Sequence, residues 1–189
     1  MKTACWSLLC WICFLLTSCG LPRTAATPEM TGPDQQGGRL LNIRVERWDT
    51  LRFSGLLGLR ENAAGLYYVL LDATGVKLLE VEVARDGRHN LLRVSGPLQK
   101  TDFAPFLSEA LARIYLQEPD EMPCGGSWFY RLCREESEDN GWRKYGQAGP
   151  FKVWQVTAAG IAGEGDEAVV YRQPWLGVSI SLKRADFGT

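Results

Sequence analysis

The chain has 189 residues, and its 21 lysine and arginine side chains nearly balance its 22 aspartate and glutamate side chains, so that the formal net charge at pH 7 is −1. This balance excludes the basic excess that is typical of nucleic-acid-binding proteins, and it gives no sign of a polybasic segment for a membrane surface.

The first 18 residues have the three-part pattern of a secretory signal peptide. Lys2 gives a positive start, residues 4–16 are almost all apolar, and the small residues Thr17 and Ser18 follow. An α-helix of the apolar length covers roughly 20 Å, whereas the hydrocarbon core of a bilayer is about 30 Å thick. We therefore expect residues 1–18 to be a leader that is removed, and not a membrane-spanning helix.

The next residue is a cysteine, and Leu16-Thr17-Ser18-Cys19 resembles the lipobox of bacterial lipoproteins. The resemblance implies that Cys19 receives a diacylglyceryl group, becomes the N-terminus after cleavage and gains a further acyl chain. Two or three chains hold a protein stably at a bilayer, since each buried methylene adds about 0.8 kcal/mol. In that family Gly20, where an aspartate would signal the inner membrane, implies the outer membrane with the domain facing the periplasm. The alternative is an ordinary signal peptide in which Cys19 has no role.

Residues 19–38 are predicted to be a flexible tether that begins at the acylated N-terminus. They are rich in proline and glycine and have few large apolar side chains, so burial cannot offset the entropy of ordering them. Residues 39–189 then provide enough chain for one domain with its own hydrophobic core.

Alternation of apolar and polar residues predicts consecutive antiparallel strands in this domain, beginning near Arg39. Two stretches show the alternation most clearly, and the apolar residues of each share one face: Leu51, Phe53, Leu57 and Leu59 in the first, and Leu79, Val81 and Val83 in the second. Asp86 and Gly87, which follow the second stretch, predict a tight hairpin turn.

One helix is predicted between Thr101 and Pro119. Thr101 or Asp102 can cap its start, and Pro119 lies just past its end. Its large apolar residues recur every three or four positions and form one apolar face, which includes Phe106, Leu107, Leu111 and Ile114. We expect this face to lie on the sheet.

After the helix the same alternation predicts five more strands, in the segments 126–132, 142–146, 150–156, 167–173 and 177–184. The chain is therefore expected to be mainly β, with about nine or ten antiparallel strands. A strongly curved sheet or half-barrel wrapped around the helix would cover the apolar face of the sheet and protect its edges.

The cysteines predict one disulfide. Three of the six would leave with the leader and Cys19 would be acylated, which leaves Cys124 and Cys133. A pair of cysteines in an exported chain is typical of a disulfide, and closing a loop of about ten residues stabilises a fold by roughly 2.5 to 3 kcal/mol. The alternative, a metal site with two thiolate ligands, lacks further ligands because His89 is the only histidine. We expect no metal and no cofactor.

The segments FSGLLGLRENAAGLYYVLLDATGVKLLEVEV and AVVYRQPWLGVSISL, separated by the helix and preceded by the lipobox, carry a family resemblance. Over residues 39–184 the chain is similar to the LolA/LolB-like half-barrels. More narrowly, it resembles an uncharacterised family of outer-membrane lipoproteins whose genes often lie beside aryl-polyene biosynthesis genes. The resemblance implies that the protein binds or transfers a lipid, an acylated product or the acyl chain of a lipoprotein.

A half-barrel of this kind can hold an apolar ligand between its sheet and its helix. The residues expected to line the cavity are Leu51, Phe53, Leu57, Leu59, Leu79, Val81, Val83, Phe106, Leu107, Leu111 and Ile114. The same side chains would serve equally well as a packed core with no ligand. In that case the protein would be an interaction lipoprotein that presents its loops to an envelope protein partner.

An enzyme is not expected. The sequence has no nucleophile elbow, no phosphate-binding loop and no cluster of metal ligands, and His89 lies beside a predicted turn. The acidic residues Glu135, Glu136, Glu138 and Asp139 are expected to form a solvated loop. The segment Pro174-Trp175-Leu176 stands between two strands, where it could form an exposed apolar tip that touches a membrane or a partner.

Overall fold

The computed structural model describes residues 38–136, 141–159 and 168–185. All of them belong to one compact unit, Asp34–Thr189. The expected leader, the acylation site Cys19 and the tether up to residue 37 lie outside the described residues. No helix in the described ranges is long and apolar enough to cross a membrane.

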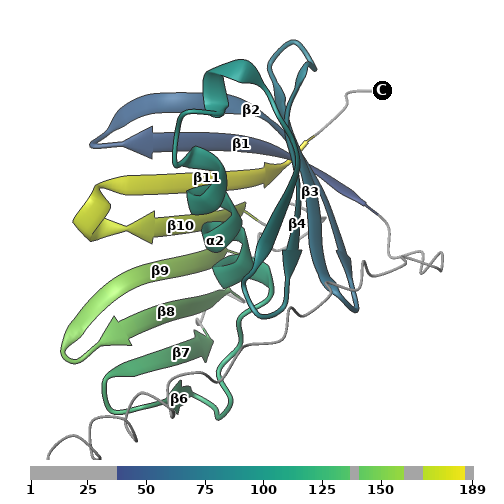
Figure 1. The fold of residues 1–189 in the computed structure, drawn as a ribbon. Helices are drawn as coiled ribbons and strands as arrows, with labels where there is room; N and C mark the ends of the chain where they lie inside the picture. Colours follow the sequence, from purple (N-terminus) through teal and green to yellow (C-terminus); the bar gives the residue numbers. More distant parts are fainter. Residues whose placement is uncertain (1–37, 137–140, 160–167, 186–189) are drawn as a thin grey trace, which may run out of the picture. The chain divides into compact units, whose positions relative to one another are not determined.

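Across these ranges, eleven antiparallel strands form a single curved sheet that does not close into a barrel (Figure 1). Strands β1 to β5 form one meander and strands β6 to β11 form a second, and the two join where β1 pairs with β11. The strands are β1 (Arg39–Arg47), β2 (Thr50–Asn62), β3 (Gly65–Asp72), β4 (Lys77–Ala84), β5 (His89–Val94), β6 (Cys124–Gly126), β7 (Tyr130–Glu136), β8 (Trp142–Ala148), β9 (Phe151–Ala159), β10 (Ala168–Gln173) and β11 (Val178–Arg184).

The predicted mainly β fold, with a strongly curved antiparallel sheet and one main helix, is confirmed. The sheet has eleven strands where nine or ten were expected, and the three residues of β6 are too few to produce an alternation pattern. In β6, Cys124 lies opposite Cys133 of β7, and the two form the predicted disulfide.

Strand β7 starts and ends later than the predicted strand 126–132. Residues 127–129 form a hairpin turn instead, in which the backbone amide of Ser127 donates to the carbonyl oxygen of Tyr130 at 2.8 Å. The pairing of Cys124 with Cys133 sets this register, and sequence alternation gives no information about it.

The acidic residues after this turn were expected in a solvated loop, and for two of them that expectation is wrong. Glu135 and Glu136 are the last residues of β7, and the hydroxyl of Tyr145 donates to the carboxylate of Glu135 at 2.7 Å. Pairing with β8 extends the strand through both residues. Glu138 and Asp139 lie outside the described residues.

The curvature of the sheet coincides with interruptions of its ladder. Extra residues in a strand bend it and increase its twist. Such register shifts occur between Val45 and Glu46 in the β1–β2 pairing, between Leu70 and Leu71 in β3–β4, between Glu80 and Val81 in β4–β5, and between Gly146 and Gln147 in β8–β9.

Helix α2 (Phe103–Tyr115) lies against the concave face of the sheet (Figure 1). Asp102 occupies its N-cap position as expected, but its side chain makes no capping hydrogen bond. The buried residues of the helix include Leu107, Leu111 and Ile114, which belong to one core with the inner side chains of the strands. Two short 3-10 turns, η1 (Gly96–Leu98) and η2 (Pro174–Leu176), complete the described elements.

Candidate ligand-binding pocket

Most of the residues expected to line a central cavity are packed against one another. Each of these side chains is at most 3% exposed, so it contacts other protein atoms over nearly its whole surface. The set comprises Leu57, Leu59, Leu79, Val81, Val83, Leu107, Leu111 and Ile114. The middle of the interface between sheet and helix is therefore a packed core.

Leu51 is not part of the packed core, because the register of the β1–β2 pairing shifts next to Leu51. Phe53 lies opposite Val45, whereas Leu51 lies opposite Glu46, which makes Arg52 the extra residue. Residues directly opposite each other in a strand pair point to the same face. Glu46 follows the inward-facing Val45 and points outward, so Leu51 also points outward, and it is 49% exposed.

An open pocket of about 580 Å³ lies at one end of the packed core. Its apolar lining comes from the first turn of α2, from β1, from η2 and from β11, through Phe103, Phe106, Val45, Leu176 and Val178. This volume falls within the roughly 300 to 1,000 Å³ that is usual for small-molecule sites.

The first turn of α2 places its two phenylalanines in this pocket. Phe103 and Phe106 are three residues apart and therefore share one side of the helix. The ring of Phe53, 5.9 Å from that of Phe103 between centroids, packs behind it. Of the predicted cavity residues, Phe106 lies in the pocket lining and Phe53 supports it.

The rim of the pocket carries charge. Glu46, Arg47, Arg52 and Asp102 surround the apolar floor. Glu46 is engaged by Arg44, with 2.7 Å between the guanidinium nitrogen and the carboxylate oxygen. Among the described residues neither Arg47 nor Arg52 has an ion-pair partner, so both guanidinium groups are available to an anionic group at the mouth.

A second, more polar depression of about 450 Å³ lies near the other end of α2, and it includes Glu109, Arg113 and Glu118. Arg113 pairs with Glu109, and Glu118 pairs with Arg134 and Lys144, whereas Arg85 and Asp120, which also line the depression, have no ion-pair partner among the described residues. The two pairs of Glu118 link the chain just after the helix to β7 and β8.

Lys144 of β8 is a buried cation that sequence reasoning missed. Its side chain is fully buried, and its Nζ donates to the carbonyl oxygens of Ile114 at 2.9 Å and Gln117 at 2.6 Å, and to the carboxylate of Glu118 at 3.1 Å. Burial lowers the pKa of Lys144, and the Glu118 carboxylate opposes that shift. A cation bound to the last carbonyls of a helix stabilises its C-terminal end.

Two further polar contacts tie α2 to the sheet. The hydroxyl of Tyr68 lies 2.9 Å from that of Ser108, which in turn donates to the carbonyl oxygen of Ala104 at 2.8 Å. Burial raises the pKa of Tyr68 to about 12. Near the other end of the helix, Arg113 donates to the hydroxyl of Tyr171 at 2.6 Å. These groups position the helix.

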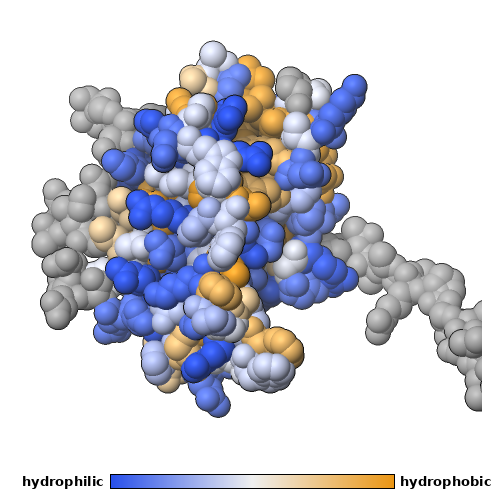
Figure 2. All heavy atoms as spheres, turned by 90° about the vertical axis from the view of Figure 1, so that its left-hand side faces the viewer, coloured by the Kyte–Doolittle hydropathy of each residue, from blue (hydrophilic) through white to orange (hydrophobic). Residues whose placement is uncertain are grey.

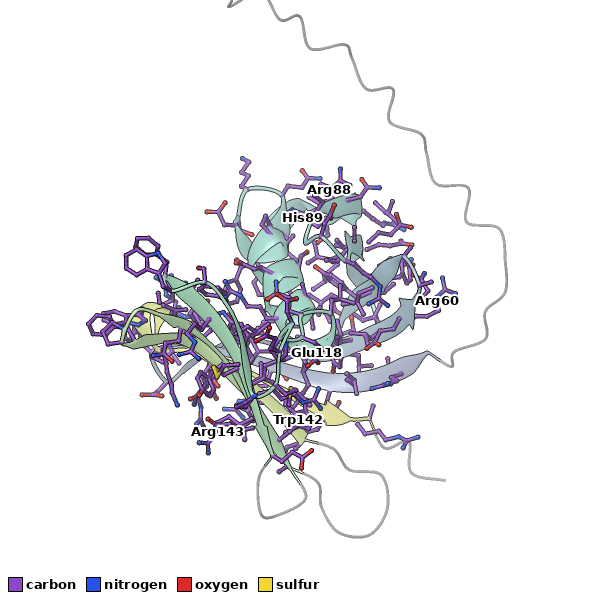
Figure 3. All side chains as sticks on the ribbon, turned by 90° about the horizontal axis from the view of Figure 1, so that it is seen from below. Arg60, Arg88, His89, Glu118, Trp142 and Arg143 are labelled. Carbon is purple, nitrogen blue, oxygen red and sulfur yellow. A yellow bond between two sulfur atoms is a disulfide. The ribbon has the colours of Figure 1, made fainter. Side chains whose placement is uncertain are left out.

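The remaining candidate residues do not converge. Figure 3 shows His89 beside Arg88, well apart from Glu118 and Trp142. His89 is exposed at the start of β5. Within the described ranges, no group of three or more histidine, cysteine or acidic side chains is placed to hold a metal ion.

Compared with known proteins, the chain matches no family model and no curated protein sequence. The features that bear on function are therefore the pocket, its charged rim and the N-terminal sequence.

Proposed function

We propose that this protein binds an amphiphile that has an apolar chain and an anionic head group. The observation that carries the proposal is the pocket of about 580 Å³, which combines an apolar floor with two unpaired arginines at its mouth. The apolar part of the ligand would lie against Phe103, Phe106 and Val178. Its head group would accept hydrogen bonds from Arg47 and Arg52, because guanidinium groups bind phosphate and carboxylate groups well.

The proposal also places the protein at the outer membrane as a lipoprotein, with Cys19 acylated and the domain facing the periplasm. The lipobox-like sequence supports this location, and the curved sheet around one helix is consistent with a LolA/LolB-like half-barrel. Binding or transfer of a lipid requires no chemical step, so the proposal assigns no catalytic residue. Mass spectrometry of the membrane-extracted protein tests the anchor, since the N-terminal peptide should carry acyl groups on Cys19.

A second candidate function is an envelope interaction lipoprotein without a ligand. The packed state of the central core favours it, because the side chains expected to enclose a guest enclose one another instead. The two candidates differ in the use of the pocket at the end of α2.

Displacement of a fluorescent fatty-acid probe distinguishes them. Val178→Phe places a larger side chain in the pocket and should weaken probe binding by about tenfold or more, which corresponds to about 1.4 kcal/mol. Val170→Phe on β10 is the matched control, because Val170 is half-buried and lies outside the pocket and the core. The control should bind the probe as the wild type does.

Two results would contradict the proposal: wild-type protein that binds no probe and yields no extractable lipid, or equal probe affinity in both variants. Arg47→Glu should lower the affinity for a fatty acid more than for an uncharged probe of the same chain length. That difference reports the head-group contact separately from the apolar floor.

A further inference from the structure

Four hairpin turns lie at the same end of the sheet, on the left in Figure 1. Neighbouring strands run in opposite directions, so the turns β1–β2, β10–β11, β8–β9 and β6–β7 all point the same way. Each turn exposes an aromatic side chain by more than half of its surface. These four residues, which we name the aromatic tip row, are Trp48, Trp175, Phe151 and Trp128.

Contacts between neighbouring turns hold the first three members of the row in place. The backbone amide of Trp48 donates to the carbonyl oxygen of Gly177 at 2.7 Å, across the two turns. The rings of Trp175 and Phe151 meet edge to face with their centroids 5.9 Å apart, and the indole of Trp175 donates to the carbonyl oxygen of Lys152 at 3.3 Å. The contacts between neighbouring turns thus fix the positions of these three exposed rings.

The fourth turn adds a pair of rings. Trp128 and Phe129 are in contact with each other, with ring centroids 3.6 Å apart, and both are more than 60% exposed. Leaving large aromatic side chains in water at the tips of four successive turns loses the free energy that burial would provide. Such a concentration of exposed apolar side chains is typical of an interaction surface.

The charge around the row is positive. Arg47 precedes Trp48, Lys152 follows Phe151, and Arg131 lies two residues beyond Phe129. Within residues 47–50, 126–131, 148–152 and 173–177, all of which the structure describes, these three basic residues stand against one acidic residue, Asp49. The chain as a whole has a net charge of −1, so the charge at this end of the sheet is opposite in sign to the net charge of the chain.

Rings interspersed with cations fit the headgroup region of an anionic bilayer better than they fit a protein partner. Figure 2, which views this end directly, shows hydrophobic patches separated by hydrophilic side chains. A stable protein interface needs a continuous complementary surface of more than about 1,000 Å². Tryptophan favours the boundary between headgroups and acyl chains, and nearby lysine and arginine side chains strengthen binding to an anionic surface.

We propose that the aromatic tip row docks the domain onto a bilayer that contains anionic lipids. The four rings enter the headgroup region, while Arg47, Lys152 and Arg131 contact lipid phosphates. This docking is a property of the folded domain and is separate from acylation at Cys19. Leu176 belongs to the turn of Trp175 and also lines the pocket, so the pocket opens beside the docked surface. The role of the pocket beside the docked surface rests on the proposed function.

Vesicle binding tests the docking. The segment Asp34–Thr189 is suitable because it is a compact unit that contains the whole described core, and it lacks the acylation site. It should sediment with vesicles of equal parts phosphatidylcholine and phosphatidylglycerol, with a blue shift of tryptophan fluorescence. The double variant Trp175→Ser, Phe151→Ser should bind about tenfold or more weakly, since two exposed rings no longer enter the bilayer.

The matched control is Leu91→Ser, Leu92→Ser on the edge strand β5, which removes two comparably exposed apolar side chains away from the row. It should bind vesicles as the wild type does. Arg47→Glu should weaken binding to the anionic vesicles and leave any binding to pure phosphatidylcholine unchanged.

Three outcomes would overturn the docking: no sedimentation of the wild-type segment with anionic vesicles, equal binding by the aromatic double variant, or equal loss in the β5 control. Concentration-dependent dimers of the wild type that the aromatic double variant abolishes, without vesicle binding, would instead assign the row to self-association. Val178→Phe separates the two proposals, because it should weaken probe binding in the pocket about tenfold or more while vesicle binding persists.

Discussion

At the scale of single residues, Lys144 shows how a buried charge can hold the end of a helix in place. Each of its hydrogen-bond acceptors belongs to the last turn of α2 or to the chain just after it. The ring of Trp142, whose centroid is 5.5 Å from Nζ, adds a cation–π contact. The strand pattern WRKYG offered no sign of this burial, because an isolated lysine in a strand is usually exposed.

Replacing this lysine should therefore destabilise the fold strongly. Lys144→Met keeps most of the apolar stem but leaves the carbonyls of Ile114 and Gln117 without their donor, and we expect the free energy of unfolding to fall by about 2 to 3 kcal/mol. Urea denaturation measures it. Lys183→Met at an exposed position of β11 is the control and should change stability by less than about 0.5 kcal/mol. Equal effects in the two variants would disprove the capping role.

At the scale of elements, alternation along the chain predicted the inward side chains of β2 and β4, and three-to-four spacing predicted the helix. What it could not predict were the places where the ladder shifts. One extra residue, Arg52, turns Leu51 outward and leaves Phe53 inside. A single sequence gives no signal for that shift, because Arg52 fits the alternation equally well with and without it.

Sequence reasoning about the site failed for a related reason. The residues expected to line a cavity could also form a filled core, and the packing of their neighbours decides between the two. The pocket depends instead on where α2 begins relative to β1 and β11, which is a tertiary relation. Likewise, Arg47, Lys152 and Arg131 form no basic run in the sequence, and folding gathers them at one end of the sheet. The exposed tip predicted at Trp175 was visible because it follows a proline in a turn.

The contact between the β1–β2 turn and the β10–β11 turn makes Gly177 sensitive to substitution. Its φ is +61°, and a Cβ placed there would lie 2.3 Å from a ring carbon of Trp48. Gly177→Ala should thus lower the free energy of unfolding by about 2 kcal/mol, through backbone strain together with displacement of the indole.

Gly149→Ala is the matched control for this change, because Gly149 has a φ of +56° but open space around its Cβ position. In Gly149→Ala only the strain of the positive φ should lower the free energy of unfolding, by about 1 kcal/mol. Both values come from urea denaturation. If Gly177→Ala cost no more than Gly149→Ala, the contact between the turns would contribute nothing to stability.

At the scale of the whole molecule, stability should depend on pH through the buried hydroxyls that hold the helix. Tyrosine in an unfolded chain titrates near pH 10, whereas burial raises the pKa of Tyr68 to about 12. The stability from the neutral hydroxyl is full below about pH 10 and is lost as the pH rises toward 12. Burial lowers the pKa of Lys144, so its effect has the opposite sign and acts below the usual lysine value of 10.5.

Urea denaturation at a series of alkaline pH values checks this expectation. The free energy of unfolding should fall by about 1 to 3 kcal/mol between pH 10 and 12. The free energy of unfolding of Tyr68→Phe should fall less over the same pH range, because this variant has no hydroxyl to ionise at position 68. An identical pH profile in the variant would show that Tyr68 is not the group responsible.

The pairing of β1 with β11 has a consequence for how the molecule forms. The register Ile43 with Leu182 and Val45 with Ile180 joins residues near the two ends of the described chain, in the middle of the sheet. Contacts between such distant residues form slowly, because the closure entropy of the intervening chain must be overcome first. If the N-terminal part of the domain is available first, strands β1 to β5 can pair early. One side of β1 nevertheless stays unpaired until β11, which ends at Arg184, is available. The concave surface is therefore completed last, once nearly the whole domain is available to fold.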